Sequence, residues 1–160
     1  LTLERLVDME PIEVSGILRQ NRSGLLIQQY VGQFPYLDVQ AAVQPITRTI
    51  LRVTLTIRAQ FEWSDRVHGT VEPFWVWVED NENERIYHTE YFLLHKRQKD
   101  EAHTLAFTVP IFEPLESQYI VRAVSDRWLN AETIVTLSLG ELTLPDKYPP
   151  HTTLLKLCPL

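Results

Sequence analysis

Apolar and polar residues alternate one by one along several short stretches, and this alternation constrains the fold more than any other feature of the chain. The odd positions of 51–57 hold Leu, Val, Leu and Ile, and the even positions of 52–58 hold only Arg and Thr. A β-strand points successive side chains to opposite faces, so this pattern predicts a strand with one buried face. Further strand-like stretches lie at 37–43, 74–78, 85–94, 105–111, 119–124 and 134–139. About seven strands separated by turn residues, without a stretch that suits a crossover helix, predict a mainly-β domain folded as a β-sandwich.

Apolar residues before Pro35 recur at helical spacing instead. Pro11 suits the first turn of a helix, and acidic Glu13 follows near the positive end of the helix dipole. We expect a helix–loop–helix segment over residues 1–36 and the sandwich over residues 37–160, with an extended, proline-punctuated tail after Leu144. A segment of about 35 residues buries too little surface to fold alone, so it must pack against something else.

Charge and cysteine content exclude several classes of protein. The formal net charge of −6 argues against nucleic-acid binding over the whole surface. Cys158 is the only cysteine, which excludes an internal disulfide or a thiolate zinc site and suits a reducing compartment. No run of about 18 apolar residues is present, and Leu1 begins directly in an amphipathic pattern without a signal peptide. We therefore expect no membrane association and an intracellular location, nuclear or cytosolic or both.

No residue pattern in the chain points to catalysis. The five histidines form no H-x-H or H-x-x-x-H pair, and the five glycines build no phosphate-binding loop. Cys158 and His151 could be imagined as a thiol–imidazole pair, but nothing marks an oxyanion hole or an orienting carboxylate beside them. The sequence therefore predicts no catalytic residue, no metal site and no cofactor for this chain.

A basic, polar turn separates the two longer expected helices. It contains Arg19, Asn21, Arg22 and Ser23. Helix capping by Asn21 or Ser23 explains the turn on its own. Helix N-termini also present backbone N–H groups to phosphates, and the neighbouring arginines would help, so these four residues are the candidate nucleic-acid contact.

Aromatic residues supply the candidate docking surface. Trp75 and Trp77 alternate with Phe74 and other apolar residues along one expected strand. At least one of the two tryptophans should point away from the side that Phe74 occupies, which would offer partner proteins an aromatic surface. Arg127 and Trp128 complete the candidate docking set.

Several sequence blocks are similar to known proteins. Residues 115–123 resemble strand F of fibronectin type III domains, in which a tyrosine, here Tyr119, opens the strand and its hydroxyl locks the preceding corner. Longer blocks resemble the unit that follows a motor cassette in the large two-cassette superfamily-2 RNA/DNA helicases. These blocks are Gln44–Thr49, His68–Gly69, Phe74–Asp80, Pro110–Pro114, Val124–Leu129, Leu144–Thr152 and Leu154–Leu157. Within the family, residues 51–55, 68–71 and 122–128 look closer to the branch of the activating signal cointegrator complex helicase than to the spliceosomal helicase that unwinds the U4/U6 duplex.

The resemblance implies a non-catalytic accessory unit that braces the motor domains of an ATP-dependent helicase. ATP and magnesium would bind to those motor domains. The implied partners are the motor domains, the second cassette, proteins of a ribonucleoprotein or repair/quality-control complex, and, weakly, single-stranded RNA or DNA near Arg19 and Arg22. The competing hypothesis is a free-standing fibronectin-like module that binds proteins or carbohydrates, because the four tryptophans could suit sugar stacking.

Overall fold

The computed structural model describes residues 5–6, 9–18, 23–80, 85–112, 118–140 and 142–145. In the described part of the chain, the helices α2 (Pro11–Leu18) and α3 (Ser23–Gly32) precede the strands. The strands are β1 (Leu37–Pro45), β2 (Ile50–Ala59), β3 (Val71–Asp80), β4 (Arg85–His95), β5 (His103–Pro110), β6 (Gln118–Ser125) and β7 (Glu132–Ser138), with the 3-10 helix η1 (Lys96–Gln98) after β4. The tail expected after Leu144 lies outside the described residues from position 146 onward.

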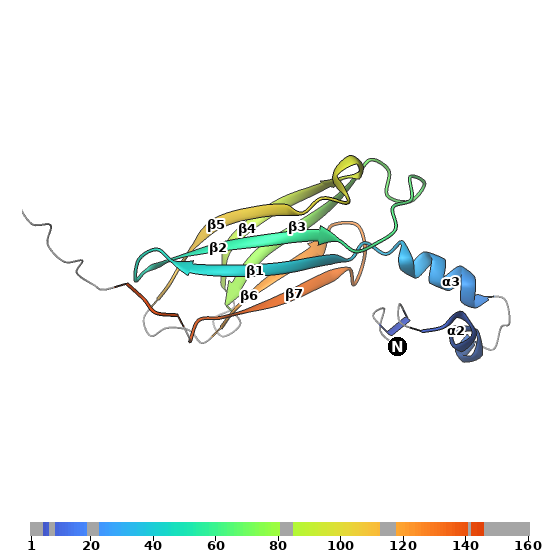
Figure 1. The fold of residues 1–160 in the computed structure, drawn as a ribbon, viewed down its shortest axis with the longest axis horizontal. Helices are drawn as coiled ribbons and strands as arrows, with labels where there is room; N and C mark the ends of the chain where they lie inside the picture. The colour runs from blue at the N-terminus through green and yellow to red at the C-terminus, as the bar shows by residue number, and fades with distance from the viewer. Residues whose placement is uncertain are drawn as a thin grey trace, which may run out of the picture.

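The strands form two antiparallel sheets that face each other. One sheet has the order β1-β2-β5, and the other has the order β4-β3-β6-β7. Figure 1 shows the two layers, with α2 and α3 beyond one end of the sandwich. β4 pairs with β3 and not with β5, so it belongs to the sheet of β3 and β6. In constant-type immunoglobulin domains, by contrast, the fourth strand pairs with the fifth in the other sheet. The predicted mainly-β sandwich, preceded by a helical hairpin, is confirmed.

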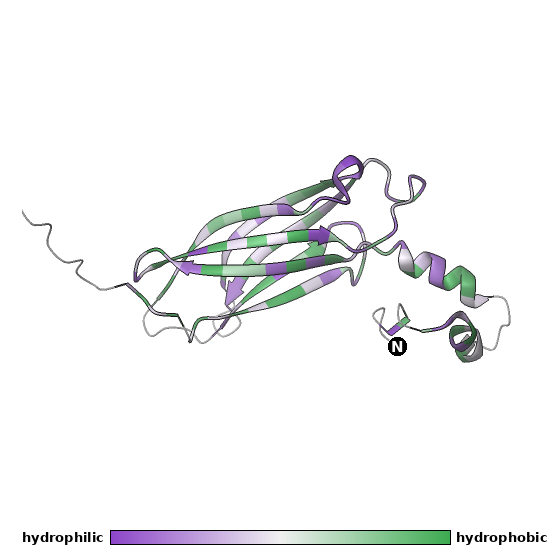
Figure 2. Cartoon of the chain, in the orientation of Figure 1, coloured by the Kyte–Doolittle hydropathy of each residue, from purple (hydrophilic) through white to green (hydrophobic). Residues whose placement is uncertain are grey.

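The alternation that predicted the strands also builds the core. In β2, the four apolar side chains at 51, 53, 55 and 57 are fully buried, and they face the buried side chains of β3 and β6 in the other sheet. Figure 2 shows the same alternation as bands of hydrophobic and hydrophilic residues along the strands. The inward side chains form one cluster, including Phe74, Val76, Val78, Val121 and Ala123. Burial of a large side chain of this kind contributes about 1.5–3 kcal/mol, so the core is the main source of stability.

Tyr119 fixes the corner between β5 and β6. Its side chain is fully buried, and its hydroxyl donates a hydrogen bond to the backbone carbonyl of Pro110 at 3.0 Å. The ring also packs on that of Tyr87, with centroids 5.0 Å apart. This is the corner that the fibronectin-like motif predicts, and it anchors the start of β6, the strand that leads to Arg127 and Trp128.

The two sheets have different outer faces. The outward residues of β2 are Arg52, Thr54, Thr56 and Arg58, and those of β5 are small or polar as well. On the other sheet, the outward residues of β3 include Trp75 and Trp77, and the neighbours of Trp75 across the strands are Tyr91 and Val124. An aromatic outer face is unusual for a surface sheet in contact with water alone.

The two helices pack closely against each other. The Gly24 N–H donates to Ser15 Oγ at 3.0 Å, and a Cβ at Gly24 would overlap the carbonyl oxygen of Pro11. Only glycine permits this approach. Val14 is buried, whereas Ile12 is 83% exposed and Leu25 is 72% exposed. The hairpin therefore has a packed side and a broad apolar side open to solvent.

No helix among the described residues is long and apolar enough to span a bilayer.

Candidate functional site

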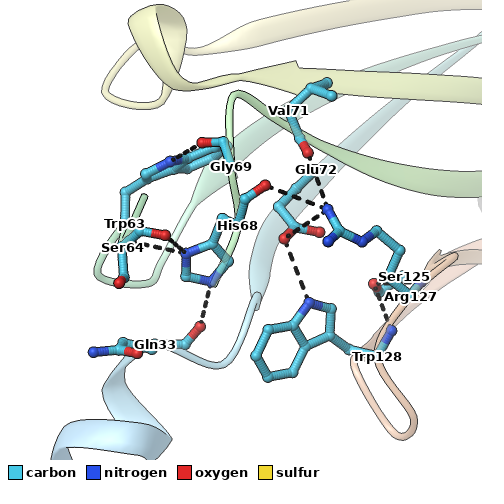
Figure 3. A network of polar contacts seen from close by, with 10 residues as sticks. All are labelled: Gln33, Trp63, Ser64, His68, Gly69, Val71, Glu72, Ser125, Arg127 and Trp128. Atoms are coloured by element: carbon cyan, nitrogen blue, oxygen red, sulfur yellow. Dashed lines mark hydrogen bonds and ion pairs between the residues drawn. The ribbon is translucent and has the colours of Figure 1, made fainter. Parts of the chain in front are cut away.

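A buried histidine joins the helical segment to the sandwich. His68 is only 1% exposed, and its Nε2 lies 2.8 Å from the carbonyl oxygen of Gln33, directly after α3. A carbonyl oxygen only accepts, so Nε2 carries the hydrogen. Nδ1 then accepts from the Ser64 N–H at 2.9 Å. The neutral Nε2–H tautomer satisfies these two contacts. Nδ1 also lies 3.1 Å from the Ser64 carbonyl oxygen, and Figure 3 draws the contacts of the ring as dashed lines.

Further contacts hold the chain after α3 between two loops of the sandwich. The Glu62 N–H donates to the Gly32 carbonyl at 2.7 Å. On the other side, the Phe34 ring meets the Trp128 indole edge-on, with centroids 5.3 Å apart. The His68 ring stacks on the same indole at 5.7 Å. The loop before β3 and the loop after β6 thus hold the helical segment from both sides; we call this cluster the junction.

Glu72 is the buried charge of the junction. Its side chain is fully buried, and Oε1 accepts from Trp128 Nε1 at 3.4 Å and lies 3.6 Å from an Arg127 guanidinium nitrogen. That nitrogen also donates to the carbonyls of His68 and Val71 at 3.3 and 3.4 Å. Oε2 has no hydrogen-bond partner within the described part of the chain. Burial raises the pKa of Glu72, and the Arg127 charge, the Trp128 hydrogen bond and His68 oppose this only in part.

The loop between β6 and β7 is fixed by its own hydrogen bonds. Ser125 Oγ accepts from the N–H groups of Arg127 and Trp128, both at 3.2 Å, and the Ser125 N–H donates to the Ala131 carbonyl at 2.8 Å. Asn130 takes the left-handed conformation, with φ of 62°, which closes the turn. Arg127 and Trp128 are therefore placed in the junction, where both make contacts within the chain.

Besides the junction, a second candidate site is the outer face of the sheet β4-β3-β6-β7. Trp75 and Trp77 both point outward, away from the buried Phe74, as predicted for at least one of them. We call this surface the aromatic face. Its outward residues form rows that run across β4, β3, β6 and β7 in that order. One row is Tyr91, Trp75, Val124 and Glu132, and the next is Thr89, Trp77, Arg122 and Ile134. Glu79 is the next outward residue of β3 after Trp77.

Asp126 organises one end of the aromatic face. Its two carboxylate oxygens accept from Trp75 Nε1 at 2.9 Å and from the Tyr91 hydroxyl at 3.1 Å. The two rings lie 4.5 Å apart, centroid to centroid, and Trp75 remains 41% exposed. The aromatic pair is thus held in place while it stays accessible to a partner.

An ion-pair chain organises the other end. Glu79 accepts from Trp77 Nε1 at 2.7 Å and from Arg122 Nε at 2.5 Å, and Arg122 also lies 3.5 Å from Glu132. Burial alone would raise the pKa of Glu79, but the hydrogen bonds from Trp77 and Arg122 and the Arg122 charge together lower it. Trp77 is half-buried and thus less exposed than Trp75.

The comparison with protein families gives one clear match. Residues 4–138 match the family described as the Sec63 Brl domain. The chain belongs to the Sec63 Brl domain family. The family resemblance seen in the sequence blocks is thereby confirmed.

Curated relatives of this Sec63 Brl chain are much longer proteins. The human "Activating signal cointegrator 1 complex subunit 3" is 55% identical over 163 residues, and the Bos taurus protein of the same name is 54% identical over 163 residues. The Arabidopsis thaliana "DExH-box ATP-dependent RNA helicase DExH12" is 51% identical over 160 residues. Each match covers all of this chain, which spans about 7% of the length of those relatives.

Solved structures also match this chain at low similarity. The sensor domain of the anti-sigma factor RsgI4 from Pseudobacteroides cellulosolvens matches with a TM-score of 0.40 and 13% identity, over 74% of this chain and 94% of that chain. The architecture given above rests on the strand order and not on this similarity.

The predicted site residues of this Sec63 Brl unit separate into three places. Trp75 and Trp77 lie together on the aromatic face, whereas Arg127 and Trp128 lie in the junction. Ser23 begins α3, and the other predicted nucleic-acid contacts lie outside the described residues; they are Arg19, Asn21 and Arg22.

The sequence patterns did not single out the residues that complete the junction and the aromatic face. These are His68, Glu72, Tyr91, Asp126, Glu79 and Arg122. His68 and Asp126 stand in the blocks 68–69 and 124–129, which resemble the helicase family, and that resemblance was the available signal. In the described ranges, no three His, Cys, Asp or Glu side chains group together so as to hold a metal ion.

Proposed function

We propose that this Sec63 Brl unit is a non-catalytic accessory part of a larger ATP-dependent RNA helicase. Support comes from the relatives, one of which is named an ATP-dependent RNA helicase, and from the small share of their length that the chain matches. The sequence itself contains no phosphate-binding loop. ATP and magnesium would bind to motor domains elsewhere in such a polypeptide.

The proposed role of the sandwich is docking through the aromatic face. The single observation that supports this best is Trp75, which is 41% exposed although its indole N–H is already bonded to Asp126. A partner can cover such a ring without leaving a polar group unpaired, so desolvation costs little and apolar area is gained. Large aromatic side chains held in this way are typical centres of binding energy in protein interfaces.

The proposed role of the junction is to hold the helical hairpin at a fixed angle to the sandwich. The hydrogen bond from His68 to Gln33 and the Phe34–Trp128 contact support this role. A docked sandwich would then also position the turn with Arg19 and Arg22, which we propose contacts a single RNA or DNA strand. The docking partners would be the motor domains, the second cassette, or proteins of a ribonucleoprotein or quality-control complex in the nucleus or cytosol.

The docking role is tested in the complete parent helicase by Trp75→Ser. Ile50→Ser is the matched control, because Ile50 is 40% exposed, like Trp75, but lies on β2 in the other sheet. We expect Trp75→Ser to lower duplex unwinding or complex assembly several-fold, while Ile50→Ser changes neither. Unchanged unwinding and assembly in Trp75→Ser would contradict the proposal.

A further inference from the structure

The aromatic face presents rings whose polar atoms are already occupied. Trp75 Nε1 and the Tyr91 hydroxyl both donate to Asp126, and Trp77 Nε1 donates to Glu79. A partner therefore finds the π surfaces of these rings and not free donors. A hydrogen bond from an aromatic ring to a carboxylate makes the ring richer in electrons, which strengthens its attraction for a cation.

The charged groups on the aromatic face are mostly negative. Among the described residues, this face has three carboxylates, those of Asp126, Glu79 and Glu132, and one guanidinium, that of Arg122, an excess of two negative charges. Arg122 is bonded most closely to Glu79, at 2.5 Å, and Glu132 is 3.5 Å away and 46% exposed. Asp126 and Glu132 therefore have more accepting capacity left than Glu79. Asp126 bonds Trp75 and Tyr91 directly, and Glu132 pairs with Val124 at the β7 end of the row of Tyr91, Trp75 and Val124.

Apolar residues surround the same row. Leu93 is 44% exposed and is the next outward residue after Tyr91 on β4, opposite Pro73 of β3. Ile134 is 49% exposed and pairs with Arg122. The surface therefore combines exposed aromatic rings, flanking carboxylates and aliphatic contacts. Phosphate groups are repelled by such a surface, whereas a cation attached to an apolar segment finds a complementary one.

We propose that the aromatic face binds an arginine-bearing apolar segment of a protein partner. The guanidinium stacks on Trp75 and Tyr91 and pairs with Asp126 or Glu132, and the neighbouring apolar side chains of the segment cover Leu93 and Val124. Arginine suits this site because its planar group stacks on an aromatic ring and still donates to a carboxylate. The inference rests on the docking role proposed above and assigns its chemistry.

Fluorescence anisotropy with labelled peptides tests this directly. The probes are a peptide of alternating leucine and arginine, a matched peptide of alternating leucine and glutamate, and a single-stranded oligouridine RNA. We expect the 160-residue chain to bind the arginine peptide, in a salt-dependent manner, and to bind neither of the other probes at this face.

Variants separate the stacking from general attraction to an acidic protein. Trp75→Leu keeps the charge and an apolar side chain but removes the ring, and it should weaken arginine-peptide binding about two- to five-fold, the size of an exposed cation–π contact. Trp75→Phe should restore most of the affinity, which also shows that the fold tolerates substitution there. Glu132→Gln should weaken binding about two-fold, whereas the exposed Glu101→Gln, outside the face, should not change it.

Equal affinity of the wild-type chain and Trp75→Leu for the arginine peptide would overturn the proposal. So would equal binding of the arginine and glutamate peptides, or competition by the RNA that depends on Trp75. If one of these results appears while Trp75→Ser still impairs the parent helicase, docking stands and its arginine chemistry is wrong. If Trp75→Ser is also without effect, both proposals fail.

Discussion

The Nε2–H of His68 donates to the backbone carbonyl of Gln33 across 2.8 Å, and this bond joins two parts of the chain that are 35 residues apart. It connects the end of the helical segment to the loop before β3. Because the imidazole is buried and bonded at both nitrogens, it acts as a fixed connection between the hairpin and the sandwich.

Loss of this connection should destabilise the fold. His68→Phe keeps an aromatic ring between Phe61 and Trp128 but leaves the Gln33 carbonyl and the Ser64 N–H without their partner. We expect the free energy of unfolding to fall by about 1–3 kcal/mol, the cost of buried polar groups left unpaired. Chemical denaturation measures this loss. His95→Phe on β4 is the control and should change stability by no more than about 0.5 kcal/mol; a similar loss in both variants would contradict the assigned role.

Glu72 should make stability depend on pH in a direction unusual for a carboxylate. Its pKa is raised in the folded state from the ordinary value of 4.5, mainly by burial. The folded state then holds the proton more tightly than the unfolded chain. Stability attributable to Glu72 is therefore full below the unfolded pKa and is lost as pH rises through the folded pKa. Glu72→Gln cannot titrate, so its stability relative to wild type should increase over this pH range in denaturation experiments.

Glu79 provides a control of opposite sign. Its pKa is lowered in the folded state, so its contribution is present above the unfolded pKa and is lost as pH falls through the folded pKa. Glu79→Gln should therefore lose stability relative to wild type as pH rises. Parallel pH profiles for the two variants would show that the surroundings assigned to Glu72 are wrong.

Two glycines in the helical hairpin should respond oppositely to alanine. A Cβ at Gly24 would overlap the Pro11 carbonyl, whereas a Cβ at Gly16 would meet nothing within 4 Å. Gly24→Ala should loosen the hairpin and raise amide exchange in α2 and α3. Gly16→Ala should lower exchange there, since alanine favours a helix by about 1 kcal/mol over glycine. Exchange that rises equally in both variants would disprove the close packing at Gly24.

The turn between α2 and α3 is predicted to contact a nucleic-acid strand. Mobility shift with single-stranded RNA at low salt should show weak binding that decreases as salt rises. Arg19→Ala combined with Arg22→Ala should remove it, and Arg52→Ala combined with Arg58→Ala on β2 should not. An absence of binding by the wild-type chain would remove the strand contact and leave the docking role intact. Glycan binding that requires Trp75 would instead favour the alternative of a carbohydrate-binding module.

The strands and the outward direction of Trp75 and Trp77 could be predicted because both follow from the parity of residues within one strand. The contacts that complete the two surfaces depend on how distant segments meet. Asp126 is 51 residues from Trp75 and 35 from Tyr91, so its role follows only from strand register and from the turn after β6. Likewise, nothing local marks His68 as the partner of Gln33. The contacts of Asp126 and of His68 can be identified only once the three-dimensional arrangement of the two sheets and their loops is known.

We expect the aromatic face to be covered by a partner in the working protein. Hydroxyl-radical footprinting with mass spectrometry can compare oxidation of Trp75 and Tyr91 in the 160-residue chain and in the assembled complex of the proposed parent helicase. Docking predicts that both residues become strongly protected in the complex, while Ile50, equally exposed on the other sheet, reacts at the same rate in both samples. Equal oxidation rates of Trp75 and Tyr91 in the two samples would contradict the account.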